Sequence, residues 1–252
     1  MAKPIGLQLY SVRDAAKEDF PGTLRRVAEM GYKGVEFAGL HGHDPREIRK
    51  IVDDLGLTVT SSHTGLPTAE NISRMADTEL ALGNKRVVVA GLGTDALKTL
   101  DACRESAEKL NTAVELLKPY GLSLGMHNHA YEFDKVGKRY AYDVIMTDVP
   151  EMFSQLDVYW VVVAGLDPKA ILGEYAERIP LLHVKDGMVN PPSPMTAIGS
   201  GSLPVPEIIN AADPNTVEWL IVELDECNCD MMEAVEKSYN YLVSNGLALG
   251  NK

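Results

Sequence analysis

Apolar and polar positions along the chain follow two periods that alternate in a fixed order. Before Gly31, the apolar residues Leu24, Val27 and Met30 fall at helical spacing, and after it the run "GVEF" (34–37) is strand-like. The same junction occurs four times, 25, 27 and 38 residues apart, at Gly31, Gly56, Gly83 and Gly121. Glycine just past a helix supplies the left-handed conformation that satisfies the last carbonyls. The chain is therefore predicted to repeat a strand–helix unit.

Continuing this pattern along the chain gives eight predicted strands, at residues 5–9, 34–37, 57–62, 86–91, 121–127, 153–157, 179–184 and 218–223. Strands that alternate with helices pair in parallel through right-handed crossovers. Eight units in 252 residues fit a closed (β/α)₈ TIM barrel of the α/β class better than an open doubly wound sheet. Length alone also allows two domains, but no linker or composition break appears, so we expect residues 1–252 to form a single TIM-barrel domain. By propensity, 157–165 also reads as a strand, which leaves the end of the sixth strand open.

Charge and composition argue against several classes of partner. The net charge of −12 argues against a nucleic-acid or anionic membrane surface, because both require basic patches. The longest apolar stretch, around 158–166, is too short to span a bilayer, and the start of the chain lacks the apolar core of a secretory signal. Three cysteines make no disulfide framework, and Cys227 and Cys229 are expected to be ordinary loop or helix-start residues. A cytoplasmic protein is the expectation.

Ionisable side chains gather where the predicted strands end. In a barrel of this kind, chemistry takes place on the loops at the carboxyl ends of the strands. These positions hold Glu36, His63, His127, His129, Glu132, Asp157, His183 and Glu223. The last four strand ends in succession all carry a carboxylate or an imidazole, which neighbouring strands bring to one place.

Carboxylates that converge in a partly buried site repel each other, and a divalent cation relieves this repulsion. Carboxylate oxygens with one imidazole suit Mn²⁺, Mg²⁺, Co²⁺ or Zn²⁺ with open coordination positions. The spacing of Cys227 and Cys229 does not suit a structural zinc site. A single metal ion is therefore the expected cofactor.

Each of these residues also has an ordinary structural interpretation. An isolated acid after a strand is more often a cap, and Asp44, followed by Pro45, is well placed as the N-cap of the helix after "HGHD". Asp186 is open to the same interpretation as a turn cap. The joint placement of Asp157, His183 and Glu223 on consecutive strand ends favours a site over coincidence.

Several motifs along nearly the whole chain resemble one family. They are "GLQLYSVRD", "GYKGVEFAG", "HNHAYEF", "LDVYWVVVAGLDP", "RIPLLHVKD" and "LIVELDE". Together they resemble the sugar phosphate isomerase/epimerase superfamily, the xylose isomerase-like barrels. The resemblance implies a metal ion, most often Mn²⁺, held by Glu, Asp, His and Glu from strands five to eight. Asp157, His183 and Glu223 carry over directly.

The first ligand does not carry over cleanly. In the ketose 3-epimerase branch the glutamate lies near the position of Gly125, whereas in the "HNH…EF" branch Glu132 is the natural candidate. His127 or His129 is its competitor.

Two further departures from the family pattern bear on the reaction. Trp160 stands where the endonuclease branch has a histidine of a multi-metal cluster, which disfavours an endonuclease-like phosphodiesterase. Ser200 stands where relatives often have an acid between two glycines.

The resemblance implies proton abstraction next to a carbonyl of a small sugar or keto-sugar, as an isomerase or epimerase. By analogy Glu132 and Glu223 are the acid and base, and five residues bind substrate: Glu36, His63, His127, His129 and Lys185. The alternatives are a keto-sugar lyase or dehydratase, either similar to an inosose dehydratase or one that cleaves or epimerises a 3-keto-glycoside, and, less favoured, a non-catalytic barrel subunit. Isomerisation, epimerisation and elimination share one intermediate, so the sequence leaves them open, together with the identity of the sugar and a homo-oligomeric state.

Overall fold

Eight parallel strands form a closed barrel in the computed structural model, which describes residues 2–190 and 192–252. The strands pair in chain order, and the pairing of the last with the first closes the barrel. The barrel strands are β1 (Lys3–Gln8), β2 (Gly34–Phe37), β3 (Thr58–Thr64), β4 (Arg86–Val89), β5 (Ser123–His127), β8 (Phe153–Asp157), β9 (Leu181–Val184) and β12 (Trp219–Val222). The expected (β/α)₈ TIM barrel is confirmed.

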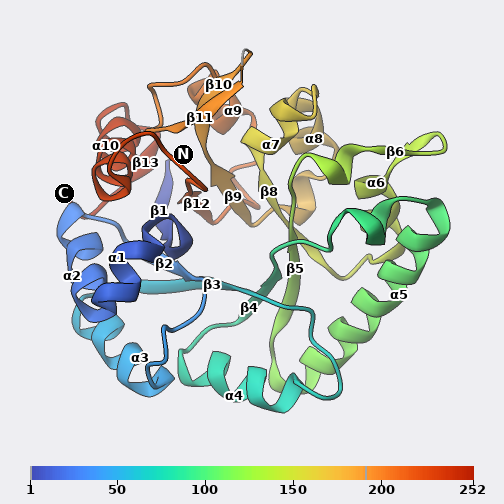
Figure 1. Ribbon diagram of the computed structural model, residues 1–252, viewed down its shortest axis with the longest axis horizontal. Helices are drawn as coiled ribbons and strands as arrows, with labels where there is room; N and C mark the ends of the chain where they lie inside the picture. Colours follow the sequence, from blue (N-terminus) through green and yellow to red (C-terminus); the bar gives the residue numbers. More distant parts are fainter. Residues whose placement is uncertain (1, 191) are drawn as a thin grey trace.

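The helices form an outer ring around these strands (Figure 1). They are α1 (Arg13–Glu18), α2 (Phe20–Met30), α3 (Pro45–Asp54), α4 (Ile72–Ala81), α5 (Leu100–Leu117), α6 (Ala141–Asp148), α7 (Val158–Val163), α8 (Pro168–Glu174), α9 (Val205–Ala211) and α10 (Met231–Ser244). Three short additions lie outside the barrel pattern: the hairpin β6 (Lys135–Val136) with β7 (Arg139–Tyr140), the hairpin β10 (Asp186–Val189) with β11 (Pro192–Thr196), and β13 (Ala248–Leu249) beside β1. No helix within residues 2–190 and 192–252 has both the length and the apolar character needed to cross a bilayer.

The junction glycines act as the sequence pattern predicts. Gly31, Gly56, Gly83 and Gly121 all have positive φ, from 66° to 108°. At Gly31, the backbone N–H donates to the carbonyl of Ala28 and so closes the last turn of α2.

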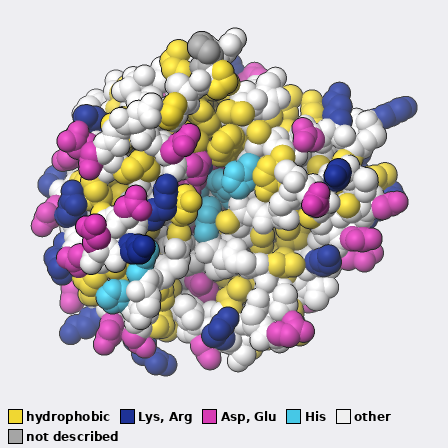
Figure 2. Space-filling model, in the orientation of Figure 1, with side chains coloured by type: hydrophobic (Ala, Val, Ile, Leu, Met, Phe, Trp, Pro, Cys, Tyr) yellow, Lys and Arg dark blue, Asp and Glu magenta, His cyan; other side chains and the backbone are white. Residues whose placement is uncertain are grey.

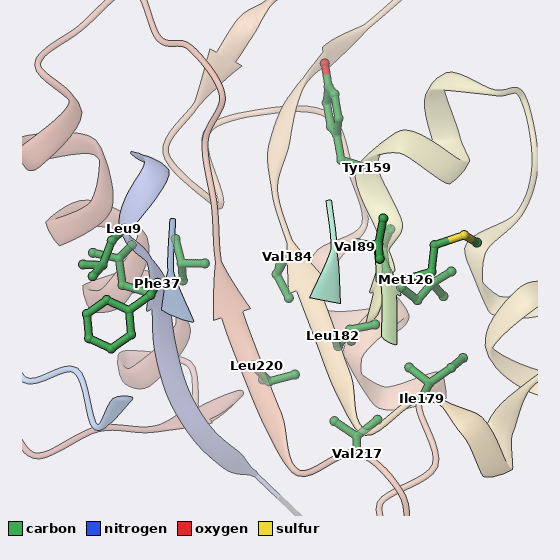
Figure 3. Close-up of a cluster of buried hydrophobic side chains, with 14 of the residues drawn as sticks. Leu9, Phe37, Val89, Met126, Tyr159, Ile179, Leu182, Val184, Val217 and Leu220 are labelled. Atoms are coloured by element: carbon green, nitrogen blue, oxygen red, sulfur yellow. The ribbon is translucent and has the colours of Figure 1, made fainter. Parts of the chain in front are cut away.

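Side chains along each strand point alternately outward and inward, so the barrel has one apolar layer between strands and helices and another inside the strands. Leu182 and Val184 point outward and pack with side chains such as Leu220 in the layer between strands and helices (Figure 3). Leu181 points inward and packs with Val88 and Ile221 inside the barrel, where Phe153 and Trp219 lie against them. Because side chains alternate with a period of two, the residue two places after an inward one also faces the interior. His183 after Leu181 and Glu223 after Ile221 are placed in this way.

The end of the sixth barrel strand is settled by a cap. Asp157 accepts hydrogen bonds from the backbone N–H groups of Tyr159 (3.0 Å) and Trp160 (3.1 Å), and so starts α7 directly after β8. The β-prone segment 157–165 is therefore mainly helical. The N-cap role of Asp44 is confirmed by its hydrogen bond from the N–H of Arg46 (2.8 Å).

Candidate metal centre and cavity

Four ligand-type side chains meet inside the barrel at the carboxyl ends of neighbouring strands. His127 ends β5, Asp157 ends β8, His183 lies in β9, and Glu223 follows β12. Each offers a nitrogen or oxygen atom, these atoms all lie within 4.8 Å of one another, and all four residues are buried. A second group, of His63, His127 and His183, meets the same criterion and shares two of these residues.

His183 is held between two carboxylates. Its Nδ1 lies 2.8 Å from Glu223 Oε2, and its Nε2 lies 2.7 Å from Glu36 Oε1. Burial disfavours the charged imidazole, but the two carboxylates outweigh burial and raise the pKa of His183 to about 10. The ring is thus oriented through both of its nitrogens.

Glu36 supports His183 from behind and does not reach the cavity. Its carboxylate accepts hydrogen bonds from Gln8 Nε2 (2.6 Å), Ser61 Oγ and Gln155 Nε2. Burial would raise the pKa of Glu36, but the charges of His63 and His183 and the hydrogen bonds from His183 and Ser61 lower it to about 2. Since Glu36 is fully buried, its position does not fit the expected contact with substrate. It fits a residue that orients a metal-binding histidine.

Lys185 is also fully buried, contrary to the expectation of a substrate-binding side chain. Its Nζ lies 2.8 Å from Glu223 Oε2, 3.1 Å from Asp157 Oδ2 and 2.8 Å from Asp225 Oδ2. Burial would lower the pKa of Lys185, but these three carboxylates hold it well above its ordinary value. The ammonium group therefore balances the negative charge of the site from within the protein.

Glu132 lies outside the four-residue group. Its Oε2 accepts the backbone N–H of His129 (2.7 Å), and its Oε1 lies 3.8 Å from His129 Nδ1. The chain leaves β5 at His127 and forms a 3₁₀ turn at Tyr131–Phe133, which carries Glu132 behind His129. The geometry therefore favours His127 over Glu132 as the fourth ligand.

The donor set fits a divalent cation. Five buried side-chain atoms of the described residues lack a hydrogen-bond partner: His127 Nδ1, His129 Nδ1, Glu132 Oε1, Asp157 Oδ2 and Trp160 Nε1, although Asp157 Oδ2 keeps its ion pair with Lys185. Two of them, His127 Nδ1 and Asp157 Oδ2, belong to the four-residue group. Buried polar atoms without partners are rare and call for an explanation. Burial and the neighbouring His183 hold the pKa of His127 well below its ordinary value, so this imidazole is already neutral, whereas His183 would release its proton when a metal binds. Two imidazoles with two carboxylates suit Zn²⁺, Co²⁺ or Mn²⁺.

A cavity of about 620 Å³ opens above these residues. The residues that line it are Tyr10, Ala38, Gly39, His63, Thr64, Gly65, Ala90, His127, His129, Glu223 and Asp225. Figure 2 shows histidine side chains near the middle of this face. Of the residues expected to bind substrate, His63, His127 and His129 reach the cavity, whereas Glu36 and Lys185 lie beneath it.

Several residues of this network are not among the sequence-based candidates. Gln8 and Gln155 hold Glu36, and Asp225 pairs with Lys185. The alternation of side chains along a strand could have identified two of them. Gln155 stands two places before Asp157, and Asp225 stands two places after Glu223, so each shares a face with a candidate residue.

The structure corrects the sequence prediction for the loop of Cys227 and Cys229 and explains the conformation of the loop that contains Ser200. Cys227 and Cys229 are not ordinary loop residues, because a disulfide joins them. The loop brings their Cα atoms to 5.2 Å, within the range that a disulfide bridges. The Asp186 carboxylate accepts the backbone N–H groups of Gly187, Gly199, Gly201 and Leu203 and thereby holds the loop that contains Ser200.

Proteins of known name and structure share this architecture. The chain is 25% identical to an inosose dehydratase of Clostridium beijerinckii, and the match covers 88% of each protein. A crystal structure of a sugar phosphate isomerase/epimerase from Parabacteroides distasonis has a TM-score of 0.83 at 28% identity, covering 99% of this chain and 96% of that one. The crystal structure of the IOLI protein with a bound zinc atom has a TM-score of 0.75 at 14% identity and covers 97% of each chain, which shows a shared fold.

The family itself follows from a match along most of the sequence. Residues 24–243 match the sequence pattern of xylose isomerase-like TIM barrels. The closed barrel and the strand-end site agree with this match. The chain therefore belongs to the xylose isomerase-like TIM barrel family.

Proposed function

We propose that this protein is a divalent-metal-dependent isomerase or epimerase that moves a proton next to a carbonyl of a small polyhydroxylated substrate. The observation that carries this proposal is the group of His127, Asp157, His183 and Glu223, two members of which, His127 and Glu223, line an open cavity. A buried cation site beside a pocket of this size is suited to binding and polarising a small molecule.

His127, Asp157, His183 and Glu223 would hold the metal, for which we propose Mn²⁺. When bound, a divalent cation supplies a Lewis acid that withdraws charge from a carbonyl oxygen. Glu36 keeps His183 in position through its hydrogen bond to Nε2. Lys185 would neutralise the part of the carboxylate charge that the cation leaves unbalanced.

Proton transfer is assigned to the side chains that reach the cavity. Glu223 lines it and is our candidate for one of the two groups that carry the proton. Glu132 is fully buried and reaches the cavity only through His129, whose side chain is 34% exposed. Burial would lower the pKa of His129, but Glu132 outweighs burial and raises it. We therefore propose that His129, backed by Glu132, is the second group.

A dehydratase is the second candidate. The support for it is that the curated relatives at 22–25% identity are inosose dehydratases. Elimination begins with the same proton abstraction and then expels a hydroxyl group from the neighbouring carbon, with Glu223 or His129 within reach as the proton donor.

Hydrogen exchange in D₂O tests the proposal. The Mn²⁺-loaded protein is incubated with a panel of ketoses and inososes, and incorporation of deuterium next to the carbonyl is followed by NMR. We expect exchange for at least one substrate and its loss in Glu223→Gln. Epimerisation or isomerisation returns a labelled sugar, whereas dehydration gives a product with one water fewer. Absence of both exchange and product with every compound would overturn the enolisation mechanism.

A further inference from the structure

A disulfide holds a segment that few other interactions restrain. Residues 223–230 lead from the end of β12 to the start of α10 without helix or strand. Among the described residues, no backbone–backbone hydrogen bond involves residues 226–229. The bond between Cys227 and Cys229 is therefore the main restraint on this part of the chain.

This disulfide adds little to the stability of the fold. It closes a loop of only three residues, and a cross-link removes less entropy from the unfolded chain when its loop is short. Cys227 is half-buried and Cys229 is exposed, so a reagent in solvent reaches the bond. Exposed disulfides are the labile ones, whereas structural disulfides resist reduction. The bond is thus suited to reversible cleavage.

A pocket of about 390 Å³ beside the disulfide admits a small reagent. Both cysteines line this pocket, together with Arg13 and three acids, Asp14, Glu226 and Asp230. The acids outnumber the cation, so the pocket attracts positive charge and repels negative charge. A thiol that carries an ammonium group is therefore favoured over one that carries a carboxylate.

Asp225 connects this segment with the candidate metal centre. It stands two residues before Cys227, and its carboxylate lies 2.8 Å from Lys185 Nζ. Lys185 also contacts Glu223 and Asp157, which are two of the candidate ligands. A cation held by these two carboxylates takes up their charge, so Asp225 is then the remaining partner of the buried ammonium. Displacement of Asp225 leaves that ammonium unbalanced beside the cation and weakens metal binding.

We propose that Cys227 and Cys229 form a redox-active site that exchanges with low-molecular-weight thiols, preferably cationic ones, and that reduction of the pair weakens divalent-metal binding through Asp225. The coupling to the metal rests on the proposed function, whereas the exchange does not. Because the carbonyl of Asp225 accepts a hydrogen bond from Arg13 (2.8 Å), we expect reduction to shift Asp225 without unfolding the end of the strand.

The exchange consists of two successive substitutions at sulfur. A thiolate attacks Sγ of the exposed Cys229, the disulfide breaks, and Cys227 leaves as a thiolate that takes up a proton. A second thiolate then attacks the reagent's sulfur in the mixed disulfide, and Cys229 leaves and is protonated in turn. Two thiols are oxidised to one disulfide, and the protein gains two electrons and two protons.

Rates of reduction by two thiols test the exchange site. The protein is treated with cysteamine or with 3-mercaptopropionate at low ionic strength, quenched and alkylated, and the peptide that contains residues 227–229 is followed by mass spectrometry. Each rate is divided by the rate of the same thiol with the uncharged 2-hydroxyethyl disulfide. We expect this ratio to favour cysteamine by at least about threefold. No reduction without denaturant, or equal ratios for the two thiols, would overturn the proposal.

Calorimetry with Mn²⁺ tests the coupling to the metal. We expect the double variant with Cys227→Ser and Cys229→Ser to bind Mn²⁺ at least about fivefold more weakly than the oxidised wild type. By linkage, bound Mn²⁺ should lower the equilibrium constant for reduction of the wild-type pair by the same factor. Cys103→Ser is the matched control, because Cys103 is a free cysteine buried in α5. Equal Mn²⁺ affinities of the double variant and the wild type would contradict the link through Asp225.

Amide hydrogen exchange keeps this proposal separate from the proposed function. The backbone N–H groups of Leu224 and Asp225 donate to Ser11 Oγ (3.0 Å) and Met195 Sδ (3.3 Å). We expect both amides to exchange about threefold faster or more in the double variant than in the oxidised wild type, whether or not metal binds. If the wild type binds no Mn²⁺, the proposed function fails. Unchanged exchange of these two amides would overturn the present proposal on its own.

Discussion

Glu36 keeps its charge inside the barrel because donors surround its carboxylate. Gln8, Ser61 and Gln155 donate to its oxygens, and His183 contacts it through Nε2. A carboxylate that accepts several hydrogen bonds remains ionised even when it is buried. Glu36 thus fixes the direction of the His183 ring and, through it, the geometry of the proposed metal site.

Replacing Glu36 by glutamine is expected to weaken metal binding without unfolding the protein. Loss of a partner that orients a ligand typically costs about 10–100-fold in metal affinity. Mn²⁺ affinity measured by calorimetry checks this expectation. The matched control is Glu79→Gln, another buried carboxylate that hydrogen-bonds Ser62 and Asn84 away from the site. If both variants bind Mn²⁺ as the wild type does, Glu36 has no orienting role.

Strand alternation makes part of the site predictable from the sequence. Asp157, His183 and Glu223 stand at inward positions of three neighbouring strands, so the pattern alone brings them together. The fourth residue was harder to predict, since His127, His129 and Glu132 differ only in where β5 ends. The burial of Lys185 could not be predicted from the sequence either, because its partner Asp225 follows a different strand.

At the scale of elements, Glu79 joins helix α4 to the strands it covers. Its carboxylate accepts hydrogen bonds from Ser62 Oγ (2.7 Å) at β3 and from Asn84 Nδ2 (2.7 Å) before β4. Burial outweighs these hydrogen bonds and raises the pKa of Glu79 above its ordinary value of 4.5. The folded protein therefore holds this proton to a higher pH than the unfolded chain does.

This difference predicts a pH-dependent effect of Glu79→Gln. The contribution of Glu79 to stability is complete below pH 4.5 and declines as the pH rises through the raised pKa, because only the unfolded chain ionises freely. The glutamine variant lacks this loss, so its free energy of unfolding relative to the wild type should increase between pH 4 and pH 7. The increase should be about 1.4 kcal/mol for each pH unit that separates the pKa of Glu79 in the folded protein from its pKa in the unfolded chain. Urea unfolding at both pH values measures the difference. A difference that does not change with pH would contradict the assignment.

Most element boundaries followed from local chemistry. Glycines with positive φ ended the helices where the pattern placed them, and Asp44 capped α3 as expected. The segment after Asp157 was ambiguous because its β-branched residues favour a strand, while the Asp157 side chain caps a helix there. The disulfide of Cys227 and Cys229 depends on a loop conformation that spacing alone does not determine.

For the whole molecule, the barrel interior combines a packed lower end with an open upper end. Phe153 and Trp219 fill the lower end, and inward-facing glycines make room for them. A Cβ atom at Gly34 would lie 2.8 Å from Thr60 Cγ2, 2.8 Å from Trp219 Cζ3 and 2.9 Å from the carbonyl oxygen of Thr58. The eight strand–helix units in the sequence predicted the barrel. The packing of side chains in its interior was not predictable, because it depends on contacts between strands that are distant in the sequence.

Gly34→Ala is therefore expected to destabilise the protein by about 1–3 kcal/mol, as overpacking of a closely packed interior does. Gly173→Ala in α8 serves as control, since its added methyl group meets no atom within 4 Å and alanine favours a helix. Urea unfolding of both variants compares them. Equal stability of Gly34→Ala and wild type would show that the barrel interior relaxes around the methyl group.

The most direct test of the central claim is the metal content of the wild-type chain and of two variants. After loading with Mn²⁺ and dialysis, we expect one ion per chain for the wild type and for Glu132→Gln, and at least tenfold weaker binding for His127→Ala. Binding below one ion per chain for the wild type with Mn²⁺, Co²⁺ and Zn²⁺ alike would contradict the metal centre. Loss of metal in Glu132→Gln with retention in His127→Ala would contradict its assigned ligands.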